Sequence, residues 1–96
     1  MNSLMERDIE KKLTQEVKKA GGLALKFVSP GMAGVPDRLV LMPEGRACFI
    51  ELKRPGEVMR PLQLKRKEKL ESLGFHVYCI DSTEKIGGVI DEIQRA

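Results

Sequence analysis

Two strand-like runs joined by a very short connection constrain this chain most. Residues 37–42 and 46–53 are short apolar runs typical of strands, and only Pro43-Glu44-Gly45 separates them. Proline suits the second position of a type I turn, and glycine suits the left-handed residue that follows. The pattern therefore predicts a hairpin with a three-residue loop.

The predicted turn also fixes which residues of the hairpin face each other. A loop centred on Glu44 pairs Met42 with Arg46 and brings Asp37 opposite Glu51, with Cβ atoms about 4.5–5.5 Å apart. Period-two alternation puts Lys53 on the same face as Glu51. The apolar side chains point to the other face: Val40, Met42, Cys48, Ile50 and Leu52.

Facing carboxylates destabilise a sheet unless they share a proton or bind a cation. Asp37 and Glu51 with Lys53 leave a net negative charge, which suits a hard divalent ion such as Mg²⁺. Each residue also has a structural interpretation. Asp37 follows Pro36 and fits a turn, and Glu51 and Lys53 fit a solvated strand face, although their apolar neighbours favour burial.

The remaining elements follow from periodicity and from glycine and proline positions. Helical spacing predicts a first helix that ends before Gly21-Gly22, and Pro61 suits the first position of a second helix. The predicted order is α-β-β-β-α-β-α, with helices at 3–20, 61–73 and 83–94 and strands at 23–28, 37–42, 46–53 and 75–80.

Length and composition limit the class of protein. The 96 residues fit one domain, residues 1–96, and 42% hydrophobic with 32% charged residues is typical of a globular chain. Apolar runs far shorter than ~20 residues argue against a membrane span, and the two cysteines lack metal-site spacing. We expect a soluble cytoplasmic protein, and its net charge of +3 permits a polyanionic partner.

Several of these residues together resemble a known family. Gly34-Val35-Pro36-Asp37, Glu51-Leu52-Lys53 and Gln63 in the next helix, with Glu6 in the helix before, are similar to the PD-(D/E)xK nuclease superfamily. More narrowly, the chain resembles the VRR-Nuc family in its small stand-alone form. The resemblance covers nearly the whole chain, including the element order.

The resemblance implies an α/β, restriction-endonuclease-like αβββαβα fold with a central mixed sheet flanked by helices. It implies a homodimeric endonuclease that uses Mg²⁺ or Mn²⁺ to hydrolyse branched DNA such as four-way (Holliday) junctions. Asp37 and Glu51 would bind metal with the Leu52 carbonyl, Lys53 would orient or activate the attacking water, and Gln63 would support the site. Since no Ser, Cys or Tyr is placed beside a base, water is the expected nucleophile.

Glu6 and Gln63 each have two interpretations. Glu6 fits a capping box with Ser3, yet it lies closer than Glu10 to the centre of the apolar helix stripe, which favours Glu6 as a third metal ligand. Glu16 lies too far along the helix to join the site. Gln63 also fits an ordinary polar residue in a first helical turn.

Basic residues gather in and around the second helix, at Arg54, Arg60, Lys65, Arg66, Lys67 and Lys69. They fit either a solvated helix face or phosphate contacts with DNA, and Lys26 and Arg38 flank the predicted site. One Tyr, three Phe and no Trp leave little aromatic surface for stacking on bases, which favours recognition of backbone shape. The alternative function is a non-catalytic nucleic-acid-binding or assembly subunit with the same fold.

Overall fold

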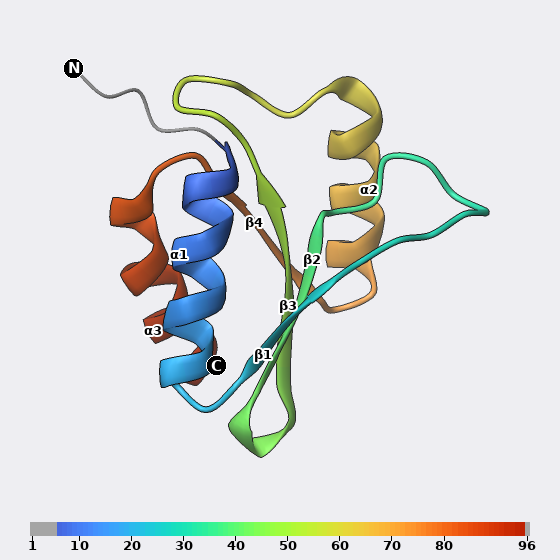
Figure 1. Ribbon diagram of the computed structural model, residues 1–96. Helices are drawn as coiled ribbons and strands as arrows, with labels where there is room; N and C mark the ends of the chain where they lie inside the picture. The colour runs from blue at the N-terminus through green and yellow to red at the C-terminus, as the bar shows by residue number, and fades with distance from the viewer. Residues whose placement is uncertain (1–5, 96) are drawn as a thin grey trace.

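A four-stranded mixed sheet forms the centre of the computed structural model, which describes residues 6–95 (Figure 1). Its order is β1-β2-β3-β4; the first two pairings are antiparallel, and β3 runs parallel to β4. The strands are β1 (Leu23–Lys26), β2 (Arg38–Met42), β3 (Arg46–Leu52) and β4 (His76–Ile80). The helices are α1 (Glu6–Lys19), α2 (Pro61–Ser72) and α3 (Ile86–Arg95).

One face of the sheet carries the hydrophobic core. Helices α1 and α3 lie side by side on this face (Figure 1) and bury apolar residues at helical spacing, as Ile9, Leu13 and Val17 illustrate. The sheet contributes the alternate side chains predicted for the hairpin: Val40, Met42, Cys48, Ile50 and Leu52. The predicted core face is therefore confirmed.

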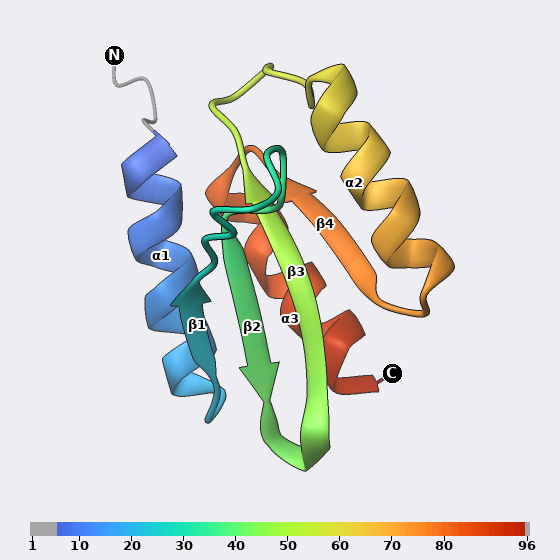
Figure 2. The ribbon, with the colours of Figure 1, turned by 90° about the vertical axis from the view of Figure 1, so that its right-hand side faces the viewer.

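The other face of the sheet is covered only in part. Helix α2 lies over the β4 side of this face (Figure 2), and none of its residues is buried. Leu23, Leu25 and Leu41 on β1 and β2 remain exposed. Among residues 6–95, no helix has the length and apolar character needed to cross a bilayer.

The hairpin has the predicted register, from Met42 opposite Arg46 to Arg38 opposite Ile50. The ladder ends with this pair. The next pair, Asp37 opposite Glu51, was predicted but is not part of the ladder. Asp37 still bonds to the β1 side, where its backbone carbonyl accepts a hydrogen bond from Phe27 N–H at 2.8 Å, whereas on the β3 side its carboxylate accepts the Leu52 N–H. The connection Pro43–Gly45 is a 3-10 turn in which Glu44 also has a positive φ, 68°, besides the glycine.

The predicted αβββαβα order is confirmed, and the differences lie at element ends. The last predicted helix is divided into a 3-10 turn, Thr83–Lys85, and α3, so its regular part begins later than expected. Strand β1 ends at Lys26, two residues before the predicted end, and the loop that leads to Pro36 follows. Ser3, the predicted helix cap, lies outside the described residues.

Candidate active site

Glu51 and Lys53 are the two charged side chains that the described part of the chain buries. Glu51 is 2% exposed at the end of β3, and Lys53, just beyond the strand, is 6% exposed. Lys53 Nζ lies 3.6 Å from Glu51 Oε2, and alternation along the chain puts both on the sheet face that α2 covers. The solvated strand face is therefore the wrong interpretation of this pair.

Gln63 connects the start of α2 to this buried pair. Its Nε2 donates to Glu51 Oε2 at 2.6 Å, and its Oε1 accepts from the Arg60 backbone N–H at 2.8 Å. The second contact is half of a capping box, so the fold of the helix end holds the amide in place. Gln63 is both a helix-capping residue and a contact of the site.

The second oxygen of Glu51 has no partner. Among the buried side-chain polar atoms of residues 6–95, Oε1 is the one that lacks a hydrogen bond. Burial, with a smaller contribution from the negative charge of Asp37, raises the pKa of Glu51 from 4.5 to about 7, although the positive charge of Lys53 acts in the opposite direction. A buried carboxylate with a free oxygen of this kind takes up either a proton or a cation.

Asp37 and the Leu52 backbone meet where the β2–β3 ladder ends. Asp37 Oδ2 accepts a hydrogen bond from Leu52 N–H at 2.8 Å. In an extended strand the carbonyl of a residue points to the same side as its N–H, so the Leu52 oxygen also faces the Asp37 side. Both residues line a surface depression of about 320 Å³, together with Glu6, Glu10 and Lys26.

The predicted set of three carboxylates is not gathered into one cluster. Among residues 6–95, no group of three or more His, Cys, Asp or Glu side chains is arranged to hold a metal ion. Glu6 is exposed on α1, at the edge of the depression that Asp37 and Leu52 line.

Two carboxylates and one carbonyl, from Asp37, Glu51 and Leu52, still fit Mg²⁺, because Mg²⁺ binds few protein oxygens and keeps several waters. The unpartnered Glu51 oxygen supports this fit.

The other acidic residues of α1 have partners of their own. Glu10 Oε2 accepts from Arg38 Nη2 at 2.7 Å, and Arg38 Nη1 donates to the Ala24 carbonyl at 2.9 Å. These contacts join α1 to the sheet, so Glu10 is occupied and Arg38 is largely turned inward. Glu16 pairs with Lys12 and Lys19, away from the site.

Comparisons with known proteins show the family of the chain. A protein named "Putative nuclease p44", from the Acyrthosiphon pisum secondary endosymbiont phage 1, is 50% identical over 84 residues, which are 88% of this chain and 90% of that protein. A solved structure described as "VRR_NUC domain" matches with a TM-score of 0.84 at 29% identity, over 90% of this chain and 94% of that one. The chain belongs to the VRR-Nuc family. No protein-family model matches it.

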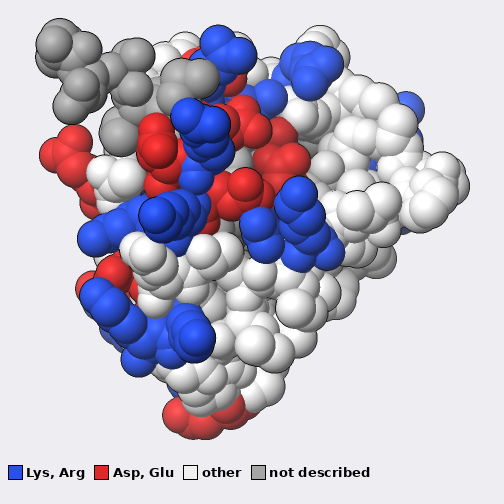
Figure 3. Space-filling view, viewed as in Figure 1, with Lys and Arg blue, Asp and Glu red and all other residues white. Residues whose placement is uncertain are grey.

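Basic side chains border the acidic centre of this VRR-Nuc fold. Figure 3 shows acidic side chains gathered between α1 and α2, with Lys and Arg around them. Arg66 donates to the Ala33 carbonyl at 2.8 Å, and Lys67 pairs with Glu71 at 2.9 Å. The other predicted DNA contacts are exposed: Lys26, Arg54, Arg60 and Lys65.

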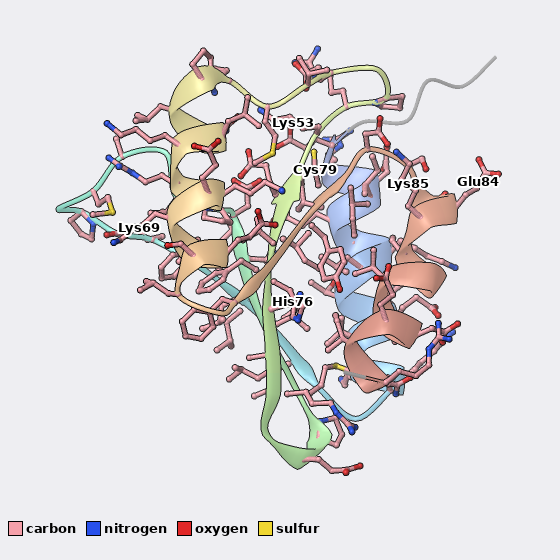
Figure 4. The ribbon with its side chains drawn as sticks, turned by 180° about the vertical axis from the view of Figure 1, so that it is seen from behind. Lys53, Lys69, His76, Cys79, Glu84 and Lys85 are labelled. Carbon is pink, nitrogen blue, oxygen red and sulfur yellow. The ribbon has the colours of Figure 1, made fainter. Side chains whose placement is uncertain are left out.

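Sequence reasoning missed one neighbour of the candidate site. Cys79 on β4 pairs in register with Glu51, and Figure 4 shows it close to Lys53. Burial is the main cause that raises the pKa of this half-buried thiol, and the negative charge of Glu51 is the second. No turn fixes the register of the parallel strands β3 and β4, so no local sequence pattern indicates this contact.

Proposed function

We propose that this VRR-Nuc chain is a divalent-metal-dependent endonuclease that hydrolyses phosphodiester bonds in DNA. One observation carries the proposal: Glu51 Oε1 is buried without a partner, beside a buried Lys53 and near Asp37. Burying a carboxylate and leaving one oxygen unsatisfied costs stability, which is typical of a functional site. The family to which the chain belongs supports the same activity.

Asp37, Glu51 and the Leu52 carbonyl are the groups that would hold Mg²⁺ or Mn²⁺. A bound ion of this kind polarises the scissile phosphate and lowers the pKa of water. Lys53 presents a buried ammonium group that orients the attacking water and offsets the charge that develops on the phosphate oxygens. Gln63 fixes the Glu51 carboxylate through Oε2, which keeps Oε1 free.

Basic residues support DNA as the substrate. Phosphate contacts supply most nonspecific affinity for DNA, and Lys26, Arg54, Arg60 and Lys65 are exposed around the site. Arg38 holds α1 to the sheet and does not contact DNA in this proposal, because its guanidinium already binds Glu10 and the Ala24 carbonyl. Branched DNA, including four-way junctions, is the proposed substrate because the family resemblance implies it.

Two active sites on a homodimer would suit a branched substrate. The sheet face beside α2 leaves Leu23, Leu25 and Leu41 exposed, and their register puts them on one surface. A contiguous exposed apolar surface of this kind is typical of a protein interface. We therefore place a second copy of the chain on this leucine face, through a two-fold contact.

Cleavage assays test the proposed activity. Linear duplex, flap and four-way-junction DNA would be incubated with Mg²⁺, with Mn²⁺ and with excess chelator. We expect cleavage only with the ion, and loss of cleavage in Asp37→Asn but not in the matched control Asp91→Asn on the exposed side of α3. Full cleavage in chelator would refute the mechanism. Metal-independent binding without cleavage of any substrate would favour the non-catalytic subunit instead.

Sedimentation velocity tests the dimer. We expect Leu25→Glu to convert a dimer to a monomer, because it introduces a charge on the leucine face. Val58→Glu is the matched control, since Val58 is exposed but lies outside that face. A wild-type monomer at high concentration would refute the homodimer and leave the cleavage mechanism unaffected.

A further inference from the structure

A second hollow lies next to the proposed catalytic depression. It has a volume of about 270 Å³ between the loop after β1 and helix α2, and Phe27, Met32, Val35, Leu70 and Leu73 line it. Phe27 lines both this hollow and the depression that contains Asp37 and Leu52. A group bound in the apolar hollow would therefore lie one side chain away from the proposed metal ligands.

Cations border this apolar surface. Arg66 and Lys69, three residues apart on one side of α2, line the hollow together with its apolar residues. Neither makes an ion pair with a residue in the range 6–95, and Figure 4 shows Lys69 beside the loop. An occupant with an apolar planar body and adjacent negative charge would satisfy both parts of the lining.

The hollow is held in its shape by contacts of its own. Arg66 Nε donates to the Ala33 carbonyl, which ties the loop to α2. Gly34 has a φ of +83°, and a Cβ built there would lie 2.7 Å from Leu62 Cγ, so the loop packs directly on the helix. The Phe27 ring is supported by Phe49, at 5.3 Å between ring centroids. A preformed site of this kind loses little entropy on binding.

We propose that this hollow takes an unpaired nucleobase of the DNA substrate, with the flanking phosphates on Arg66 and Lys69. The proposal rests on the proposed nuclease function and specifies its substrate: DNA with an unstacked nucleotide beside the scissile bond. The low aromatic content favoured recognition of backbone shape alone. The hollow needs only one aromatic ring, because Met32 and the aliphatic residues supply the rest of the apolar wall.

A nucleobase fits this lining better than a second copy of the chain does. In a two-fold contact centred on the hollow the same surface faces itself, so Arg66 and Lys69 would approach the same two cations of the copy, and no acidic side chain lines the hollow. DNA brings phosphates, which complement them. The pocket also borders the catalytic depression, where DNA must bind if the chain is a nuclease.

Fluorescence anisotropy with two bulged duplexes tests the base pocket. One duplex has a single unpaired adenine, and the other has an abasic analogue at that position, so the phosphates are identical. Binding would be measured in chelator, where cleavage does not interfere. We expect the adenine bulge to bind about tenfold more tightly, because stacking of one base contributes on that scale.

Met32→Gln should abolish this discrimination while leaving affinity for the abasic duplex within about twofold. Leu64→Gln is the matched control, because Leu64 is 47% exposed against 49% for Met32 and lies outside the hollow.

Equal wild-type affinity for the two duplexes would overturn the base pocket, even if cleavage is normal. Loss of dimer in Met32→Gln with equal weakening for both duplexes would overturn it in favour of a second copy. If neither duplex binds, the pocket proposal fails; cleavage with Mg²⁺ tests the nuclease function separately.

Discussion

The two faces of the sheet differ in what they bury. Under α1 and α3 the interior is apolar, and both helices insert three or more buried side chains. Under α2 the sheet buries Glu51 and Lys53, while α2 itself buries none of its residues. The first face supplies the hydrophobic stabilisation that offsets the cost of a buried ion pair on the second. Stability and the proposed chemistry are thus divided between the two sides of one small sheet.

The largest expected effect is the loss of turnover on substitution of Lys53. We expect Lys53→Met to lower turnover by at least about 100-fold, as loss of one transition-state charge contact does, with DNA affinity reduced only slightly. Lys65→Met, on the exposed surface of α2, should instead weaken binding and reduce its salt dependence by about one unit of slope. Single-turnover cleavage and anisotropy across salt concentrations measure the two effects. Normal turnover with a large binding loss in Lys53→Met would make Lys53 an ordinary phosphate contact.

Leucine truncations compare the stability of the two faces. Leu13→Ala, in the fully buried part of α1, should lower the free energy of unfolding by about 2–5 kcal/mol through cavity formation. Leu64→Ala, on the exposed surface of α2, should cost less than about 1 kcal/mol. Urea denaturation followed by circular dichroism measures both. Equal costs would mean that α2 contributes as much to the core as α1 does.

The pH dependence of stability should separate the faces further. Burial raises the pKa of Glu51 to about 7, so the folded state binds more protons than the unfolded state between about pH 4.5 and 7. In chelator, the free energy of unfolding should therefore fall by up to about 3 kcal/mol across this range. Glu51→Gln should remove this fall, and saturating Mg²⁺ should reduce it. An unchanged profile in Glu51→Gln would show that the carboxylate is solvated.

Local patterns predicted the order of the helices and strands and the burial of Glu51 and Lys53. The tight turn fixed the β2–β3 register, and the apolar flanks of Glu51 and Lys53 indicated burial correctly. The contacts missed are nonlocal. Glu10 and Arg38 are 28 residues apart, and neither periodicity nor turn chemistry connects them. The pairing of β3 with β4 likewise depends on how α2 crosses the sheet, which one sequence leaves open.

The smallest expected effect distinguishes two carboxylates on α1. Glu10→Gln removes a half-buried ion pair with Arg38, so it should cost about 1 kcal/mol of unfolding free energy and leave the turnover of folded protein unchanged. Glu6→Gln should do the opposite, lowering turnover several-fold with stability within about 0.5 kcal/mol of wild type, because Glu6 is exposed at the edge of the proposed catalytic depression. Thermal denaturation and single-turnover cleavage of both variants test the pair. A loss of about 1 kcal/mol with normal turnover in Glu6→Gln would assign that residue to helix capping, since a cap stabilises the first turn without touching the substrate.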